Sequence, residues 1–288
     1  MARPHRRPGP ESHAPGDLLP VLAPGGAGLS IVASADLHRP CLEYAVRCGA
    51  DFVGIADLRP AHAHIRSQGG EAIAMFPRAV SLGVALRHEL VDPLPGRADP
   101  AVAVAYRRDA YELVNVRLDR LSGVVAEWLA AQGHRAKAVP ASQRTDGVRI
   151  CGAFSHKLAA RLAGLGWIGK SCLLVTPEAG PRVRWTTVLT DAPLAPAATT
   201  VLDRCGDCRA CVDICPVRAF TGRAFRPDEP REARYDAGKC DRYFQWMRRR
   251  DPATAVCGLC LYVCPHGRDA GAAQTPRLPL SPPPSATA

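Results

Sequence analysis

The stretch Arg204–Pro216, RCGDCRACVDICP, sets four cysteines and a proline in the spacing C-x2-C-x2-C-x3-C-P. A second stretch, CGLCLYVCP at 257–265, repeats its end, and Cys240 stands 17 residues upstream of that repeat. Three closely spaced cysteines wrap one backbone loop around three irons of a cubane cluster, and the cysteine before the proline ligates the other cluster. Eight cysteines therefore fill two four-ligand [4Fe–4S] sites with none left over.

The crossover of the fourth cysteine predicts two ligand sets. The first set is Cys205, Cys208, Cys211 and Cys264. The second set is Cys215, Cys240, Cys257 and Cys260. A pair of structural zinc sites is the alternative, but zinc modules usually present cysteines as separated C-x2-C pairs. The run at 205–215 fits that pattern poorly, so it favours iron–sulfur clusters and an electron-carrying protein.

The totals fit a cytoplasmic redox protein. The first 20 residues lack the apolar stretch of a secretory signal, and no run approaches the roughly 18 apolar residues of a membrane span. Clustered cysteines in a reducing compartment are more often metal ligands than disulfides. The remaining four, Cys41, Cys48, Cys151 and Cys172, are interpreted as packing residues, with approach to a cofactor as the alternative for Cys151, which precedes a glycine. The formal charge of +10 falls to about +6 with two dianionic clusters bound, which weakly favours an anionic partner.

Upstream of the cysteines, helix and strand patterns alternate. Helices are expected at 40–47, 109–132 and 155–162, the last capped by Ser155. Strands are expected at 51–55, 78–86, 135–140, 173–176 and 183–189, with a turn at 178–181 before the last. The prediction is an α/β domain over residues 25–195 and a ferredoxin-like double-cluster domain over 196–270, between disordered tails at 1–24 and 271–288.

A glycine motif lies just before the predicted strand at 173–176. The segment 164–170, GLGWIGK, matches G-x-G-x-x-G, but a helix precedes it and a strand follows. Dinucleotide binding needs the reverse order, a strand before and a helix after, so we reject that function. Two interpretations remain, a helix-ending turn and contact with a bulky cofactor. The residues concerned are Gly164, Gly166, Gly169 and Lys170.

The glycine motif, the following strand pair ending in LTDAPL at 189–194 and the double-cluster motif together resemble the epoxyqueuosine reductase family, relatives of the reductive dehalogenases. The resemblance implies a corrinoid-binding α/β domain fed with electrons by a ferredoxin-like domain. It implies a cobalamin cofactor beside the two clusters, a ferredoxin- or flavodoxin-type electron donor, and two-electron reduction of a modified tRNA base. An electron-transfer protein that docks a partner enzyme is the alternative. Neither a membrane nor DNA is expected as a partner.

Proton supply is where this chain departs from the family pattern. The family carries an acid in a V-D-[ST]-x-P segment before the glycine motif, and gapless counting from Gly164 sets Ile150 at the acid position. Asp146 is the nearest carboxylate, with an exposed turn beside Gly147 as the alternative interpretation. His156 is the second candidate, with a surface position at a helix start as its alternative. The family's helical extension for tRNA is also not expected in the C-terminal tail.

One basic–aromatic segment is a candidate for RNA contact. Arg248, Arg249 and Arg250 follow Tyr243, Phe244 and Trp246. Stacking on bases and contact with phosphates is one interpretation. The other is a helix end whose aromatic side chains pack on the cluster domain.

Overall fold

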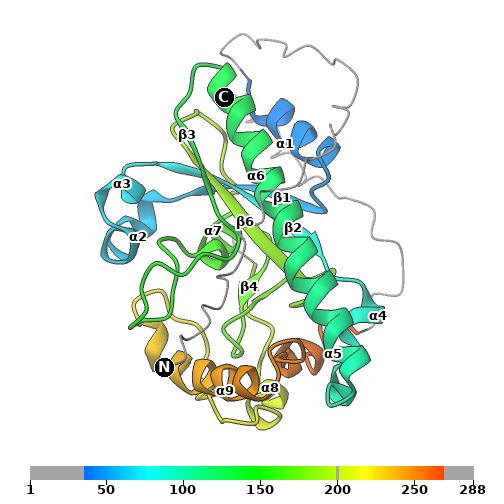
Figure 1. The fold of residues 1–288 in the computed structure, drawn as a ribbon. Coiled ribbons are helices and arrows are strands. Elements are labelled where there is room, and N and C mark those ends of the chain that lie inside the picture. The colour runs from blue at the N-terminus through cyan, green and yellow to red at the C-terminus, as the bar shows by residue number, and fades with distance from the viewer. Residues whose placement is uncertain (1–35, 199–200, 269–288) are drawn as a thin grey trace, which may run out of the picture. The chain divides into compact units, whose positions relative to one another are not determined.

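A computed structural model describes residues 36–198 and 201–268, and the predicted tails lie outside these ranges. Its centre is an antiparallel sheet in the order β1-β2-β6-β3, and β4 and β5 form a separate pair (Figure 1). The strands are β1 (Phe52–Asp57), β2 (Arg78–Ala85), β3 (Ala136–Val139), β4 (Trp167–Ile168), β5 (Leu174–Val175) and β6 (Val183–Thr190). The long β2 and β6 pair from Arg78↔Thr190 to Ala85↔Val183.

The helices of the sheet-bearing part precede residue 163. They are α1 (His38–Arg47), α2 (His62–Gly69), α3 (Glu71–Ala74), α4 (His88–Val91), α5 (Pro100–Arg107), α6 (Val114–Ala131) and α7 (His156–Leu162). Short 3-10 turns η1 (Arg59–Ala61) and η2 (Leu94–Gly96) and the π-helical stretch η3 (Arg108–Leu113) connect them. None of the described helices is long and apolar enough to cross a membrane.

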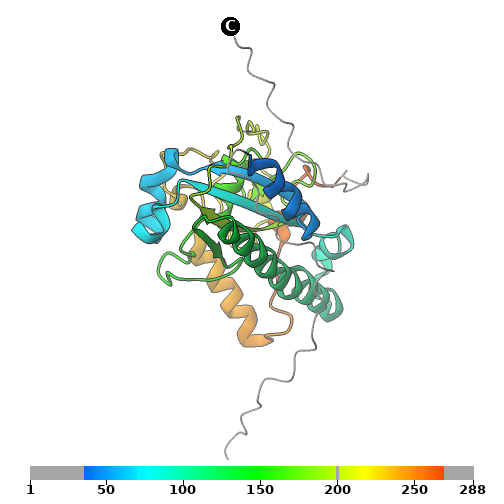
Figure 2. The same ribbon diagram turned by 90° about the horizontal axis from the view of Figure 1, so that it is seen from above.

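The two faces of the sheet differ in side-chain size. Val80, Leu82 and Val84 alternate along β2 and pack with α1 and α6 on one face, as a half-buried strand requires. Small residues face α7 on the other side, where a Cβ on Gly54 would lie 3.0 Å from the carbonyl oxygen of Ala163. Figure 2 shows the long helix α6 running alongside the strands. The small face lets α7 approach closely, and α7 carries part of the site.

Most predicted elements of this part are confirmed, with one correction. Ser155 caps α7 by accepting a hydrogen bond from the Leu158 N–H, and Gly180 forms the expected turn before β6. The helix predicted at 109–132 begins only at Val114. Asp99 and Pro100 start an earlier helix, α5, because the Asp99 side chain caps it and proline suits its first position. A π-helical stretch then joins α5 to α6.

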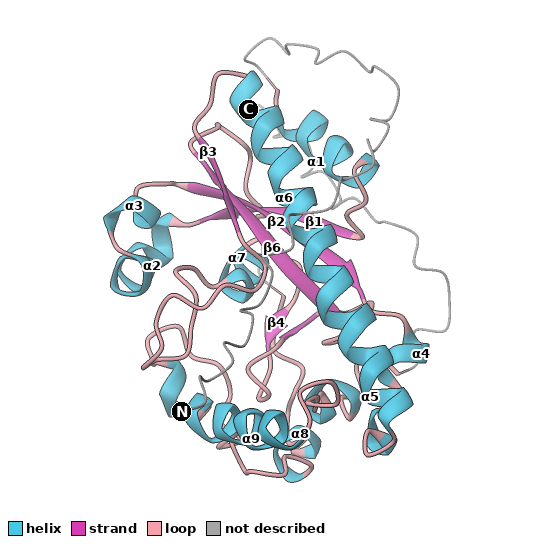
Figure 3. Cartoon of the chain, viewed as in Figure 1, coloured by secondary structure: helices cyan, strands magenta, loops and turns pink. Residues whose placement is uncertain are grey.

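Short helices and loops make up the cysteine region, residues 201–268 (Figure 3). Its elements are α8 (Ala210–Asp213), η4 (Arg231–Ala233), α9 (Ala237–Arg250) and α10 (Leu259–Tyr262). Val256 and Leu261 pack against Leu94 and Tyr106 of the preceding part. The second cysteine motif therefore shares a hydrophobic cluster with residues far upstream, while the domain boundary near 195 stays a prediction.

Candidate functional site

Thiols of the first predicted ligand set raise the pKa values of one another. The pKa of Cys211 is raised to about 11, first by burial and then by three neighbouring thiols: Cys205, Cys264 and Cys208. Burial likewise raises the pKa of Cys264 to about 11, with Cys205 and Cys208 adding to it. Thiolates of this kind are the ligands of iron–sulfur clusters, and iron removes their protons on binding. The members of the first predicted set are therefore mutual neighbours.

Thiols of the second predicted ligand set also raise the pKa values of one another. Burial raises the pKa of Cys240, and the charges of Cys257 and Cys215 raise it further. A hydrogen bond from the hydroxyl of Tyr235 acts in the opposite direction. Burial also raises the pKa of Cys260, and the other three members of the set raise it further. Cys211 of the first set raises it as well, so the two sets adjoin. Within 36–198 and 201–268, no three Cys, His, Asp or Glu side chains are spaced for a single metal ion.

The glycine motif packs on the first cysteine loop. A Cβ on Gly169 would lie 3.3 Å from Sγ of Cys205, and one on Gly166 would collide with the carbonyl oxygen of Val175. Lys170 Nζ donates hydrogen bonds to the carbonyl oxygens of Gly206, at 2.6 Å, and Cys208, at 3.2 Å. The glycines of the motif thus let the first cysteine loop and strand β5 lie close to the 164–170 backbone. Contact with a corrinoid stays a prediction for Gly164, Gly166, Gly169 and Lys170.

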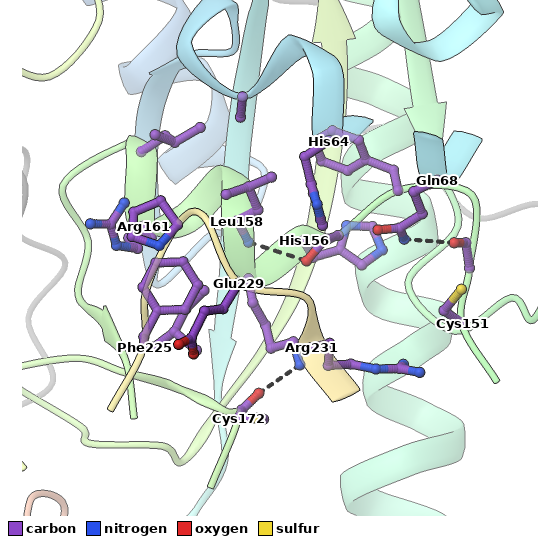
Figure 4. A pocket seen from close by; sticks show the side chains of 18 of the residues that line it. His64, Gln68, Cys151, His156, Leu158, Arg161, Cys172, Phe225, Glu229 and Arg231 are labelled. Atoms are coloured by element: carbon purple, nitrogen blue, oxygen red, sulfur yellow. Dashed lines mark hydrogen bonds between the residues drawn. The ribbon is translucent and has the colours of Figure 1, made fainter. Parts of the chain in front are cut away.

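A cavity of about 600 Å³ lies between α2, α7 and the segment 225–234 (Figure 4). Its apolar lining includes Phe154, Leu158, Ile168 and Phe225. Its cationic lining comprises Arg149, Lys157, Arg161, Arg231 and Arg234. Glu229 is the one carboxylate among the lining residues. A site of this size, apolar with a few polar groups, is typical of small-molecule binding.

Two of the cavity arginines flank the 3-10 turn η4, which begins at Arg231 and ends just before Arg234. The side chains of Arg231 and Arg234 both line the cavity. Arg231 donates to the backbone carbonyls of Ile150, at 3.2 Å, and Arg149, and so holds the 149–150 segment in place. Sequence reasoning missed this pair, because it took the cationic run at 248–250 as the notable one. The three-residue spacing was the signal available.

His156 lines the cavity and does not occupy the surface position that was the alternative interpretation. Its Nδ1 lies 2.8 Å from Thr187 Oγ1 and its Nε2 lies 3.1 Å from the carbonyl oxygen of Pro140. A carbonyl only accepts, so Nε2 carries the hydrogen and Nδ1 accepts from the hydroxyl. Burial lowers the pKa of His156 to about 4. The imidazole is therefore neutral at pH 7, with its hydrogen already donated.

Asp146 closes a turn outside the cavity lining. Its Oδ1 accepts hydrogen bonds from the N–H groups of Val148, at 2.9 Å, and Arg149, at 2.8 Å. Ile150, at the family's acid position, does line the cavity and has a positive φ of 54°. The structure places His156 in the wall of this cavity and Asp146 outside it. A catalytic role for either residue stays a prediction.

The scattered cysteines divide by position. Cys41 and Cys172 are buried, as packing residues should be, while Cys48 is exposed at the end of α1, so its predicted packing role is wrong. Cys151 is half-buried and lines the cavity.

Comparison with known proteins bears on the whole arrangement. Residues 204–267, which include all eight predicted ligands, match the family described as the 4Fe-4S double cluster binding domain. Epoxyqueuosine reductase from Pseudomonas aeruginosa is 30% identical over 205 residues, covering 67% of this chain and 49% of that protein. The resemblance to the epoxyqueuosine reductases is confirmed. The enzyme from Aliivibrio fischeri is 26% identical over 253 residues, 81% of this chain and 60% of its own length.

Solved structures share the fold. A catabolic reductive dehalogenase aligns with a TM-score of 0.61 and 22% identity, over 83% of this chain and 33% of its own. An epoxyqueuosine reductase with a modified tRNA stem loop aligns with a TM-score of 0.50 and 18% identity, over 83% and 67%. This chain spans about half the length of the curated epoxyqueuosine reductases that it matches. It is an iron–sulfur redox protein with an α/β region followed by a double [4Fe–4S] region.

Proposed function

We propose that this chain is a reductase of the epoxyqueuosine reductase type, which passes electrons through its two clusters to a substrate in the cavity. The short segment 231–235 carries the proposal. Arg231 and Arg234 line the cavity, and Tyr235, the next residue, hydrogen-bonds the predicted ligand Cys240. One turn of chain thus belongs to both the cavity wall and the surroundings of the second cluster. A site for reduction beside an electron store is what such a reductase needs.

A corrinoid is part of the proposal, as in the cobalamin-dependent relatives. A second cavity of about 420 Å³ adjoins the first and shares the lining residues Ile150, Phe154 and His156 with it. The second space, with Val139, Ile150 and Phe154 in its wall, would hold the macrocycle, and it leaves Leu158, Ile168 and Phe225 of the first cavity to the substrate. When bound, the corrinoid supplies a cobalt centre that collects electrons arriving singly from the clusters. Lys157 also lines the first cavity, and its Nζ donates a hydrogen bond to the carbonyl oxygen of Cys172 at 2.6 Å.

A tRNA partner is also proposed, and helix α9 supports it. Trp246 is 46% exposed, stacks on Tyr243 and carries Arg250 over its ring at 4.8 Å. Trp246 therefore lies at the surface, beside the half-buried Tyr243 and Phe244, where it suits base stacking and phosphate contact. A cytoplasmic location and a ferredoxin- or flavodoxin-type electron donor follow from this proposal.

The test begins with anaerobic reconstitution and joint measurement of iron, sulfide and cobalt. Reduced protein is then mixed with an epoxyqueuosine-containing tRNA stem loop, and the products are separated by mass. We expect little reduction of this base, because Ile150 stands at the acid position and both candidate donors are engaged elsewhere. General acids typically contribute about 10²–10⁴-fold to rate.

Two variants sharpen the result. Robust turnover that Asp146→Asn or His156→Gln lowers by about 10²-fold or more would assign the proton donor and the tRNA substrate together. Turnover that neither variant changes would mean that water or a bound cofactor delivers the proton. The reductase proposal is wrong if the clusters are redox-active but the protein contains no cobalt and reduces no oxidised substrate. An electron-transfer protein would then remain.

A further inference from the structure

The guanidinium of Arg234 is buried without a full set of partners. Only 5% of Arg234 is exposed, and it lines the cavity. Its Nε and Nη1 have no hydrogen-bond partner among the described residues. Burying a cation without an anion is strongly unfavourable, and such groups are normally paired. A partner that the chain does not itself provide would remove this cost.

The surroundings of Arg234 add positive charge rather than neutralise it. Arg161 and Arg234 both lie over the ring of Phe225, with Cζ 4.8 and 4.5 Å from its centroid. Glu229 already accepts a hydrogen bond from Arg223 at 2.6 Å through Oε1. Arg231, the neighbour on the same turn, is occupied by backbone carbonyls and by Glu232. The cations of the cavity therefore outnumber the negative charge that its walls offer.

We propose that this cavity binds a small organic oxyanion, a carboxylate or a phosphate monoester, with its charge on Arg234 and Arg161 and its apolar body against Phe225, Leu158 and Ile168. A planar guanidinium pairs with the two oxygens of such a group through parallel hydrogen bonds. The apolar side chains and a volume of about 600 Å³ suit a body of one or two rings. The proposal rests on the proposed reductase function, and it names a small anion as the occupant of this cavity in place of the modified tRNA base, of which little reduction is expected.

Binding can be measured without turnover, so the two proposals fail separately. The cluster-loaded protein is titrated anaerobically by calorimetry, in a buffer free of carboxylate and phosphate. The probes are benzoate, phenyl phosphate and inorganic phosphate, with neutral benzamide as the isosteric control. We expect one of the organic anions to bind, to raise the thermal midpoint, and to exceed benzamide in affinity at least about tenfold.

Variants assign that binding to Arg234. Arg234→Gln should weaken it by about 10–100-fold, the range for a lost charged hydrogen bond. Arg39→Gln removes the same charge from a residue whose side chain is 76% exposed and lies outside the cavity, and should change nothing. Without ligand, Arg234→Gln should not lower the thermal midpoint, because it removes an unpaired buried charge. A purely structural arginine would give the opposite result.

Other outcomes are equally decisive. If Arg234→Gln does not fold, Arg161→Gln replaces it, and undiminished anion binding in that variant contradicts the proposal. The proposal is also wrong if benzoate and phenyl phosphate do not bind, or bind no better than benzamide. Binding of hydroxocobalamin alone, lost in Arg234→Gln, would show that the phosphodiester of a corrinoid is the anion instead.

Discussion

The sheet region, residues 36–198, and the cysteine region, residues 201–268, are held together by different means. Along β2, every residue from Ala79 to Val84 is buried, and two hydrophobic clusters cover the two faces of the sheet. In the cysteine region α9 has 14 residues and buries only Ala237. The longest helix of the cysteine region thus contributes almost nothing to a hydrophobic core.

The difference shows where each region gets its stability. Burial of apolar surface, at about 25 cal/mol per Å², suffices for the sheet region. The cysteine region has too little of it and depends on cluster ligation, as small metal-binding domains do. A few contacts tie the regions together, among them the ion pair of Arg144 and Asp241 at 2.7 Å. Four experiments test this contrast.

Removing the clusters should have the largest effect. Iron and sulfide analysis of intact protein should give about eight of each per chain. After chelation or oxidation, we expect cleavage within 201–268 to accelerate at least about tenfold while the sheet region resists protease. Mass spectrometry of the fragments locates the cuts. Equal cleavage of both regions would show that they do not differ in the source of their stability.

Acid should act on the sheet region through His156. Because its pKa is about 4 when folded and ordinarily 6.5, its contribution is complete above pH 6.5 and is lost as pH falls through 4. The loss is at most about 3 kcal/mol. Urea unfolding of wild type and His156→Gln from pH 7 to 4 measures it. Parallel curves for the two proteins would mean that His156 does not titrate in this way.

Substitutions of two glycines separate contact between the regions from backbone strain. Gly180 and Gly133 both have positive φ, at 55° and 85°. A Cβ at Gly180 would collide with the carbonyl of His266, two residues after Cys264, whereas one at Gly133 meets nothing within 4 Å. Gly180→Ala should therefore cost about 1–3 kcal/mol more than Gly133→Ala, and lower the iron content as well. If both variants have similar stability and a full iron content, the contact between Gly180 and His266 contributes nothing to either.

The smallest expected effect is on the second cluster alone. Tyr235→Phe removes the hydrogen bond to Cys240 and should lower the potential of that cluster, since such bonds stabilise the more negative reduced state. A change of about 1 kcal/mol between oxidation states equals about 40 mV for one electron. Redox titration followed by electron paramagnetic resonance measures both clusters, and the first should be unchanged. An unaltered second potential would contradict the hydrogen bond.

Sequence reasoning is most specific where spacing alone carries the chemistry. The eight cysteines could be predicted as ligands because cluster ligation leaves a rigid C-x2-C-x2-C-x3-C pattern, and the Ser155 cap, which the structure confirms, could be predicted because a cap is a local feature. The cavity was not predictable, because Lys157, Arg161, Arg231 and Arg234 come from two distant segments that meet only in the folded chain. Nor did the pattern reveal that His156 turns inward, since its partners Pro140 and Thr187 lie on other elements.

The contact of Gly169 with Cys205 has a consequence for electron transfer. Ile168, the preceding residue, lines the cavity, so the segment that contacts a predicted cluster ligand also forms part of the cavity wall. Tunnelling rates fall steeply with distance through protein, and this stretch offers a short path. A bulky residue at 169 would push the sulfur away, and would slow the delivery of electrons even in a protein that kept both clusters.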